Sequence, residues 1–500
     1  MISFFCEIGH AGTTKKELDK LYVAVPNGFE SLDPLKAAIA QEWFVLPLIY
    51  EYLFRYNSKD EIIPDLAEVW AFQEDTSTIR IKIREGHFFS DGSKVDAKSV
   101  VQSITAYCLS TTPSAVGLRG LVGCSGANNR RIKIRAVSDY NVEMVITMAP
   151  SAFIYQLTAA PMAVLKRDKN HHALGSGPYR LESLLHDMVV LKKNDFFSRL
   201  TSSPSPSQLV IQYIAEDAIG KELKKNNLDV ASMYLTSSKS QLENPNYVVI
   251  PQAAHVTQVL VLNPNVVPFK DPKLRKVIRD AIYESEISTC AEGRMPAIGL
   301  IPTGVGGSIA NDRSVIHGPI AAKNHKLALK NPVHVEIFQH IGRKNICDEM
   351  TLKHIFANFN IFLNFRYVDN YSELDKLYVD KSTPAYIELF VFLTRDASRF
   401  LSRFTPHTTE PLFFYTDPKI EELVNKALNL GEIKQRFLLY RLANTRIEEK
   451  SSTVALYYIG HTNTIRRCRA GKSPEQIGYS PNSFLFLIEG GLADDCGEPR

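Results

Sequence analysis

The stretch from Ile79 to Gly92 reads IRIKIREGHFFSDG and contains the clearest strand-and-turn pattern of the chain. Ile79, Ile81 and Ile83 alternate with basic residues, the period of two that a β-strand with one buried face produces. Asp91-Gly92 follows as a turn dipeptide, where glycine supplies the backbone freedom that a tight turn needs. The stretch therefore predicts a half-buried strand and then a turn whose role is architectural.

Short β-rich runs and amphipathic helices alternate on both sides of this stretch. Further strands are predicted over residues 21–25, 142–148 and 256–262. A helix is predicted to begin at Asp271-Pro272, with aspartate as N-cap and proline in the first turn, and another begins in the same way at Asp417-Pro418. This alternation predicts a mixed α/β protein. The chain shows no repeat of about 20–50 residues, which argues against solenoids and propellers.

Length and charge limit the class of protein further. The 500 residues suggest two to four domains at about 100–200 residues each, and the scarcity of linker-like segments indicates domains that are interleaved. Lys and Arg number 58 against 54 Asp and Glu. This balance is too even to indicate nucleic acid or an anionic membrane as a partner. No apolar run approaches the roughly 20 residues that span a bilayer.

Seven cysteines are spread thinly over the chain, at positions 6, 108, 124, 290, 347, 468 and 496. None forms a CxxC pair, which argues against a structural zinc site of the usual spacing. One or two disulfides are compatible with this pattern, and the odd count leaves at least one thiol without an intramolecular partner. The cysteines therefore leave the redox compartment undecided.

The first six residues, MISFFC, are apolar but lack the basic segment and the full hydrophobic segment of a secretory signal. Three explanations stay open: a start placed too late, a signal that has been removed, or a cytoplasmic protein. The first two together are favoured. Whether Cys6 carries a lipid is also open.

The common catalytic spacings GxGxxG, GxxxxGK[ST], HExxH and GxSxG are absent from the sequence. His171-His172 stands in a polar loop, where solvated histidines are commoner than metal ligands. The basic runs 130–135 and 466–472 are interpreted as solvated faces. This search favours a ligand-binding module over an enzyme, and no cofactor or metal is predicted.

Eight motifs follow one another in collinear order between about residues 20 and 460. They are Ser31-Leu32-Asp33-Pro34, Ile63 to Trp70 (IPDLAEVW), the opening stretch, Val95 to Ser103 (VDAKSVVQS), Gly175 to Leu181 (GSGPYRL), Phe269 to Arg275 (FKDPKLR), Ile301-Pro302 and Tyr415 to Pro418 (YTDP). Each motif alone is weak, but the ordered set closely resembles the family 5 extracellular solute-binding proteins, the peptide and nickel receptors of ABC importers.

The resemblance implies an α/β fold of the bilobed periplasmic-binding-protein type, with mixed sheets flanked by helices and an extra subdomain in lobe one. The expected segments are 18–44 and 171–258 for lobe one, 45–170 for the inserted subdomain, 259–454 for lobe two and 455–490 for a return to lobe one. The strand around Val259 to Asn263 is expected to be one crossing between the lobes. A ligand between the lobes stabilises the closed form through contacts that the open form lacks.

The same resemblance suggests where a ligand binds. Trp43 lies in a region that lines the cleft in this family, and Trp70 occupies a structural position; burial in the core is the favoured interpretation for both. The candidate ligand-binding residues are Gln41, Trp43, Asn263, Phe392, Thr394, Arg395, Asp396 and Phe414.

One departure from the family concerns the ligand's amino group. Peptide receptors of the family hold it with an aspartate, and a carboxylate suits a buried ammonium. The corresponding position here is Leu393, three residues before Asp396, and Arg395 places a positive charge nearby. This pattern favours an anionic, neutral or unusual ligand over an ordinary peptide. Asp396 is interpreted as a loop-capping residue.

The sequence as a whole favours non-enzymatic capture of a small solute, peptide, peptide-like or other. The solute would be delivered to a membrane ABC permease with its ATPase subunits. A monomer in the periplasm or cell envelope, without a nucleic-acid partner, is expected. A cytoplasmic ligand sensor built on the same fold is the main alternative, and a diverged enzyme is a third class.

Overall fold

The computed structural model describes most of the chain between residues 20 and 469. The described ranges are 20–26, 28–37, 40–57, 61–73, 77–110, 118, 120–124, 131–159, 162–197, 206–234, 244–291, 293–310, 328–369, 371–392, 395–406 and 414–469.

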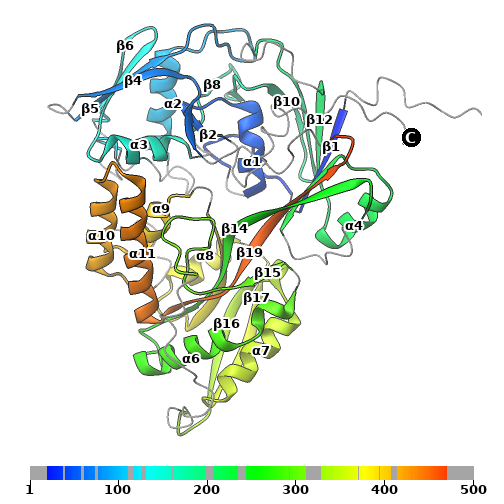
Figure 1. The fold of residues 1–500 in the computed structure, drawn as a ribbon, viewed down its shortest axis with the longest axis vertical. Helices are drawn as coiled ribbons and strands as arrows, with labels where there is room; N and C mark the ends of the chain where they lie inside the picture. The colour runs from blue at the N-terminus through cyan, green and yellow to red at the C-terminus, as the bar shows by residue number, and fades with distance from the viewer. Residues whose placement is uncertain are drawn as a thin grey trace, which may run out of the picture.

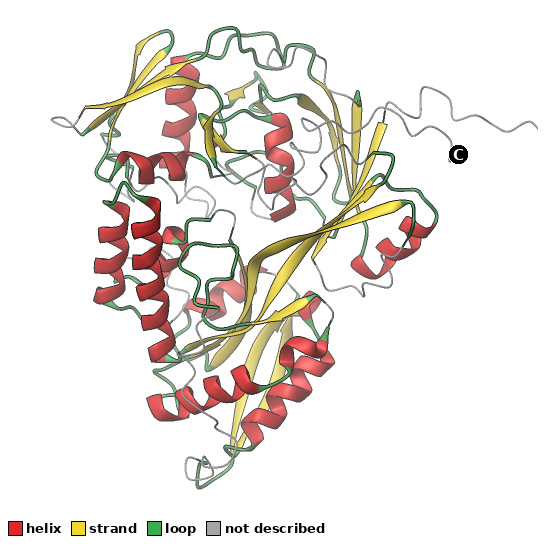
Figure 2. Ribbon diagram, in the orientation of Figure 1, coloured by secondary structure: helices red, strands yellow, loops and turns green. Residues whose placement is uncertain are grey.

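Within these ranges, one sheet of eleven strands runs through the molecule (Figures 1 and 2). Its strands are, in spatial order, β10 (Tyr179–Leu184), β11 (Met188–Lys193), β12 (Gln208–Tyr213), β1 (Lys20–Val25), β13 (Val230–Tyr234), β19 (Thr453–Arg466), β14 (Tyr247–Leu262), β18 (Ala385–Val391), β16 (Val333–His340) and β17 (Ile361–Val368), with β15 (Arg294–Pro296) paired to β19. The strands predicted over 21–25 and 256–262 are confirmed as β1 and as part of β14.

Two neighbouring strands of this sheet are unusually long. β14 has 16 residues and β19 has 14, whereas about 5–6 residues is common for a strand. They are antiparallel partners, and they cross the middle of Figure 1 in green and orange-red. At one end β19 pairs with β13, and at the other end β14 pairs with β18. The pair therefore belongs to both halves of a bilobed molecule.

The half of the sheet from β10 to β13, with the adjoining ends of β14 and β19, forms lobe one. Helix α1 (Ala40–Ile49) packs on one face, where Phe44 and Val45 join Val23 and Ile250 in one hydrophobic cluster. Helix α4 (Glu216–Lys224) packs on the opposite face. Two short hairpins connect this lobe to the next unit: β2 (Phe54–Tyr56) with β3 (Ile62–Pro64), and β8 (Lys166–Arg167) with β9 (Ala173–Leu174).

The inserted subdomain has its own hydrophobic core, drawn from residues between Leu53 and Val164. Its elements are β4 (Ala67–Gln73), β5 (Thr78–Ile83), β6 (Ile134–Ser138), β7 (Asn141–Val145), α2 (Ala97–Leu109) and α3 (Pro150–Leu157). Ile79, Ile81 and Ile83 are fully buried, so the predicted alternation is confirmed. The N-cap of α2 is Asp96, whose side chain accepts a hydrogen bond from the Ser99 amide at 2.7 Å.

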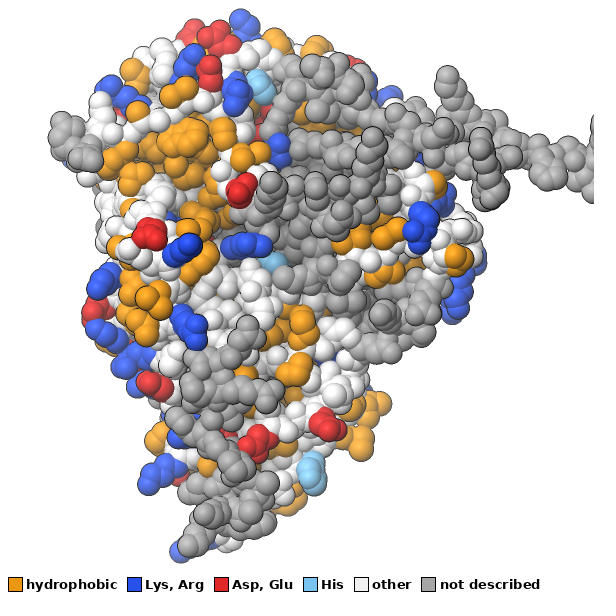
Figure 3. All heavy atoms as spheres, in the orientation of Figure 1, with side chains coloured by type: hydrophobic (Ala, Val, Ile, Leu, Met, Phe, Trp, Pro, Cys, Tyr) orange, Lys and Arg blue, Asp and Glu red, His pale blue; other side chains and the backbone are white. Residues whose placement is uncertain are grey.

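Trp70 corrects the sequence analysis, because its side chain is 40% exposed rather than in the core. It lies on β4, which among the described strands is at the edge of its sheet next to β5, and its neighbours on the strand are also exposed. Its ring makes an edge contact with Phe54 at 5.0 Å between centroids. Exposed Val69 and Phe72 lie on the same strand, and Figure 3 shows hydrophobic side chains gathered on this part of the surface.

Lobe two carries the remaining strands and most of the helices. Its helical elements are α6 (Pro272–Glu284), η5 (Ile287–Cys290), η8 (Ile341–Arg343), α7 (Ile346–Ala357), α8 (Tyr371–Val379), α9 (Ser398–Leu401), η9 (Ser402–Phe404), α10 (Pro418–Leu428) and α11 (Ile433–Lys450). Asp271 and Asp417 cap α6 and α10, accepting hydrogen bonds from the amides of Lys273 (2.8 Å) and Lys419 (2.9 Å). Both predicted helix starts are confirmed.

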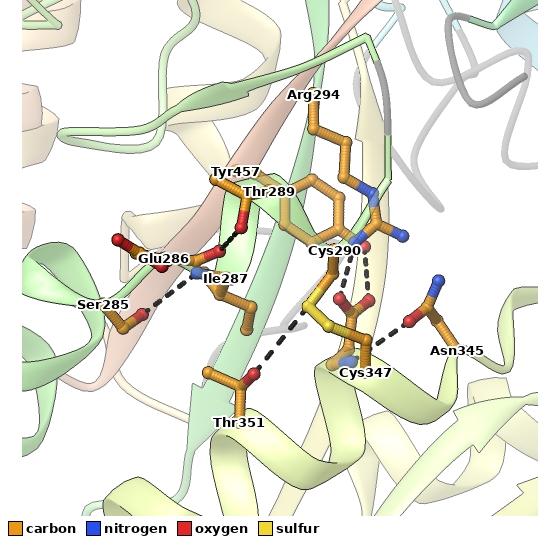
Figure 4. Close-up of a disulfide and its surroundings, with 11 residues drawn as sticks. Ser285, Glu286, Ile287, Thr289, Cys290, Arg294, Asn345, Cys347, Thr351 and Tyr457 are labelled. Carbon is orange, nitrogen blue, oxygen red and sulfur yellow. Dashed lines mark hydrogen bonds and ion pairs between the residues drawn. A yellow bond between two sulfur atoms is a disulfide. The ribbon is translucent and has the colours of Figure 1, made fainter. Parts of the chain in front are cut away.

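Disulfides tie the subdomain and lobe two internally. Cys108 at the end of α2 is bonded to Cys124, and Cys290 in η5 is bonded to Cys347 in α7 (Figure 4). Cys468 is also disulfide-bonded. Because Cys108, Cys124, Cys290 and Cys347 pair with one another, Cys468 belongs to a third disulfide. The expected one or two disulfides were therefore too few.

Candidate functional site

The hydrogen-bond ladder between β14 and β19 is irregular over residues 252–256, where the register shifts. Two carbonyls of this segment accept hydrogen bonds from other loops. Ala254 O accepts from the Gly304 amide at 3.1 Å, and His255 O accepts from the Phe392 amide at 2.8 Å. The irregular segment, which lies where the lobes meet, is thereby joined to two loops of lobe two.

The first of these loops, residues 304–307, is close-packed. A Cβ at Gly304 would lie 2.5 Å from Cε1 of His255, so no other residue fits there without displacement. Gly307 has φ +96°, which favours glycine, and a Cβ there would meet Tyr440. The Gly306 amide donates to Arg395 O at 2.8 Å. This loop therefore supports the segment that carries the predicted site.

Asp396 is 9% exposed, and both of its carboxylate oxygens accept hydrogen bonds from groups of lobe two. Its Oδ1 accepts hydrogen bonds from the Ser398 amide (2.9 Å) and the Tyr440 hydroxyl (3.1 Å). Its Oδ2 accepts one from Nη1 of Arg436 at 3.1 Å. Asp396 therefore holds the turn before α9, whose N-cap is Ala397, and also forms a buried ion pair with Arg436 that the sequence did not reveal.

Arg395 is exposed and lies close to the inserted subdomain. Its charge acts on Tyr155 of α3: burial and then Asp396 raise the pKa of the Tyr155 hydroxyl, while Arg436 and Arg395 oppose this shift. The neighbouring candidate Thr394 lies outside the described residues, as does Leu393. The 395–396 segment is thus placed where lobe two faces the subdomain.

Three other candidate residues do not join this segment: Phe392 is buried, and Asn263 and Phe414 lie at the other end of β18. Phe392 is buried, with its ring 4.8 Å from that of Phe400. Asn263 lies next to Pro384, at the amino end of β18, and Phe414 contacts Asn265 there. The length of β18 places this end roughly 20 Å from Arg395. Asn263 and Phe414 are therefore not brought together with Arg395.

Two candidates lie on α1 of lobe one. Trp43 is half-buried against the lobe-one core, and its Nε1 donates to Ala37 O at 3.2 Å. Gln41 is 4% exposed, and within the described residues its buried Oε1 has no hydrogen-bond partner. A buried polar atom without a partner costs free energy, which makes Gln41 the stronger ligand candidate of the two.

Asn463 on β19 is a candidate that sequence reasoning missed. It is fully buried, and among the described residues neither its Nδ2 nor its Oδ1 has a hydrogen-bond partner. It pairs with Ser232, the middle residue of β13, and is two residues from Ile465, which packs in the α1 cluster. The polar run Thr462-Asn463-Thr464 in an otherwise apolar strand was the available signal.

The remaining sequence motifs add no second site. His172 is exposed and pairs with Asp168 in its own loop. Arg135 and Arg466 of the two basic runs pair with Glu143 and Asp229. In the described part of the chain, no group of three or more His, Cys, Asp or Glu side chains could hold a metal. No helix there is long and apolar enough to cross a membrane.

Two bacterial binding proteins are similar to this chain in sequence. The chain is 23% identical over 299 residues to the "Glutathione-binding protein GsiB" of Escherichia coli O1:K1 / APEC, a match that spans 57% of each chain. It is 23% identical over 340 residues to the "Probable D,D-dipeptide-binding periplasmic protein DdpA" of Escherichia coli (strain K12), spanning 63% of each. The chain thus matches less than two thirds of the length of these relatives.

Similarity of fold extends over nearly the whole chain. The periplasmic binding protein DppA from Helicobacter pylori, solved in complex with peptide STSA, superposes with a TM-score of 0.78 at 20% identity, covering 94% of this chain and 98% of its own. Residues 61–324 match the family described as "Bacterial extracellular solute-binding proteins, family 5 Middle". On the bilobed fold and this match, the chain belongs to the family 5 bacterial extracellular solute-binding proteins.

Proposed function

We propose that the chain captures one small solute between its lobes and delivers it to a membrane ABC permease that works with ATPase subunits. The observation that carries this proposal is the link between the irregular segment 252–256 and the loops of Gly304 and Phe392. Because this segment lies between the two lobes, a bend there would move these loops of lobe two relative to lobe one. A ligand held there can therefore favour the closed form.

Family membership supports binding without catalysis, because the similar proteins described above are named for what they bind. We propose a monomer that is not an enzyme. The chain segments of the lobes are proposed as 18–44 with 171–258 for lobe one, 45–170 for the subdomain, 259–454 for lobe two and 455–490 for the return.

The chemistry of the proposed contacts favours a peptide-like ligand held mainly through neutral groups. Gln41 offers a buried acceptor, and Asn463 offers a donor and an acceptor. A peptide group presents the complementary donor and acceptor. Arg395 is suited to a carboxylate of the same ligand. With Leu393 in the position of the family's aspartate, we propose that a free ammonium group is not the main anchor.

The test is calorimetry with a panel of defined compounds: glutathione, D-alanyl-D-alanine, and L-peptides of two to five residues with and without N-terminal acetylation. We expect acetylation to leave binding unchanged or to strengthen it. X-ray scattering with the best compound should show a smaller radius of gyration. Binding below about 1 µM that acetylation abolishes would show that an acid anchors the amino group. Saturated binding without compaction would contradict capture by closure.

We propose a periplasmic or cell-envelope location. Disulfides persist in oxidising compartments and are rare in the cytosol, and the structure contains Cys108–Cys124, Cys290–Cys347 and a disulfide at Cys468. A cytoplasmic sensor would have these cysteines reduced. Alkylation of intact cells with a permeant thiol reagent discriminates the two: we expect these five cysteines to react only after reduction.

A further inference from the structure

Arg436 of α11 connects lobe two to the inserted subdomain. The side chain is fully buried. Its Nη1 donates to Asp396 of lobe two at 3.1 Å, and its Nη2 donates to Oγ of Ser151 on α3 at 3.0 Å. The guanidinium carbon also lies 4.9 Å from the centre of the Tyr155 ring, one helical turn from Ser151. One cation therefore contacts both units, across 285 positions of sequence.

A backbone hydrogen bond crosses the same boundary. The amide of Ala149 donates to the carbonyl of Leu428, the last residue of α10, at 3.2 Å. Ala149 is the N-cap of α3, and the first amides of a helix have no acceptor within it. Figure 1 shows α3 lying across the ends of α10 and α11. The amino end of α3 therefore contacts the carboxyl end of α10.

We propose that Arg436 is an interlobe clasp, which stays paired with Asp396 in lobe two and engages Ser151 and Tyr155 when the lobes close. The proposal rests on the hinge closure of the proposed function. Arg436 is a positioning residue, since it acts on the 395–396 segment through Asp396.

The geometry explains how the clasp forms at low cost. A buried charge is expensive unless it is paired, and Asp396 supplies the partner from the same lobe. Closure then adds only a hydroxyl acceptor and an aromatic face, and both stabilise a guanidinium. The carboxylate that holds Arg436 belongs to the residue next to Arg395. The clasp and the proposed ligand contact are therefore adjacent, so closure and the position of Arg395 are coupled.

The experiment follows hydrogen exchange of the ligand-free protein by mass spectrometry, using the peptide that contains Ala149. The test variant is Ser151→Ala with Tyr155→Leu, which leaves the Arg436–Asp396 pair intact. The ligand-free protein populates the closed form part of the time and ligand shifts it further, so we expect the Ala149 amide to be partly protected in the wild-type protein and to exchange about tenfold faster in the variant. The radius of gyration from X-ray scattering should increase.

The matched control is Arg446→Ala on the same helix. Arg446 also pairs with an aspartate, donating from Nε to Asp417 at 2.7 Å, but this pair lies wholly within lobe two. The Arg446→Ala variant should leave hydrogen exchange at the Ala149 amide unchanged. Exchange in the wild-type protein as fast as in an unstructured peptide would overturn the clasp, as would equal effects of the test variant and the control. Because no ligand is present, failure here leaves solute capture standing, and failure of solute capture leaves this result standing.

Discussion

The hydroxyl of Tyr283 donates a hydrogen bond of 2.7 Å to Oε2 of Glu448, and the glutamate is completely buried in lobe two. Its other oxygen, Oε1, has no hydrogen-bond partner within the described residues. Burial raises the pKa of Glu448 to about 7, with a smaller contribution from Asp280, while Arg279 and the Tyr283 hydrogen bond oppose the shift.

This relationship predicts how stability depends on pH. Between about pH 4.5 and 7 the folded protein retains the Glu448 proton, whereas the unfolded chain has released it. The folded state binds more protons, so the stability from this group is fully present below the unfolded pKa and is lost as pH rises towards 7. The loss amounts to at most about 3 kcal/mol. Glu448→Gln should remove this component, measured as the difference in unfolding free energy between variant and wild type from pH 4 to 8. A pH-independent difference would contradict the assignment.

Asn463→Leu should keep or increase the stability of the free protein, by up to about 2 kcal/mol, because it removes buried polar atoms that lack partners. It should weaken binding of the best compound of the panel about tenfold. The control is Asn263→Leu, since the Asn263 amide donates to Lys381 O and Thr383 O, and its loss should destabilise the protein by about 1–3 kcal/mol. Urea unfolding and calorimetry measure the two effects. A destabilised Asn463→Leu with unchanged affinity would assign Asn463 a structural role.

Arg395→Ala should weaken binding of the same compound about 10- to 150-fold, the effect of losing a charge-assisted hydrogen bond to an anionic group. Lys419→Ala, which removes another exposed cation of lobe two, is the control. Affinity within about twofold of wild type, in a variant with an unchanged unfolding midpoint, would remove Arg395 from the proposed site.

The two described disulfides should differ in their contribution to stability. Cys290–Cys347 closes a segment of 57 residues and Cys108–Cys124 one of 16. In the chain-entropy description, replacing both cysteines with alanine costs about 4 kcal/mol for the first pair and about 3 kcal/mol for the second. Chemical denaturation of the two double variants tests this order. A larger loss for the 108–124 pair would show that local packing outweighs loop length.

Much of the fold could be predicted from residues that lie close together in the sequence. The caps Asp271 and Asp417 and the alternation from Ile79 to Ile83 all act through residues close in sequence, and the structure has each as predicted. Trp70 was misassigned because burial of a strand residue depends on which face and edge of the sheet it occupies. A tryptophan on an edge strand can lie exposed.

Less of the candidate site could be predicted from the sequence. The sequence indicated the 392–396 segment, but the contacts of Asp396 come from Arg436 and Tyr440, about 40 residues later. Such pairs depend on how helices pack. Asn463 stands in a polar run, but the run does not show that the side-chain amide is buried without partners, because that depends on what surrounds it in three dimensions.

The length of β14 and β19 also determines the kind of motion that the molecule permits. Two lobes joined by separate loops could swing in many directions, but here a hydrogen-bonded ribbon continues from one lobe into the other. Bending it where the register shifts preserves the pairing on either side, while sliding one strand past the other would break that pairing. A bend at this segment is therefore the motion that the proposed closure would use, and it would carry lobe two as one body.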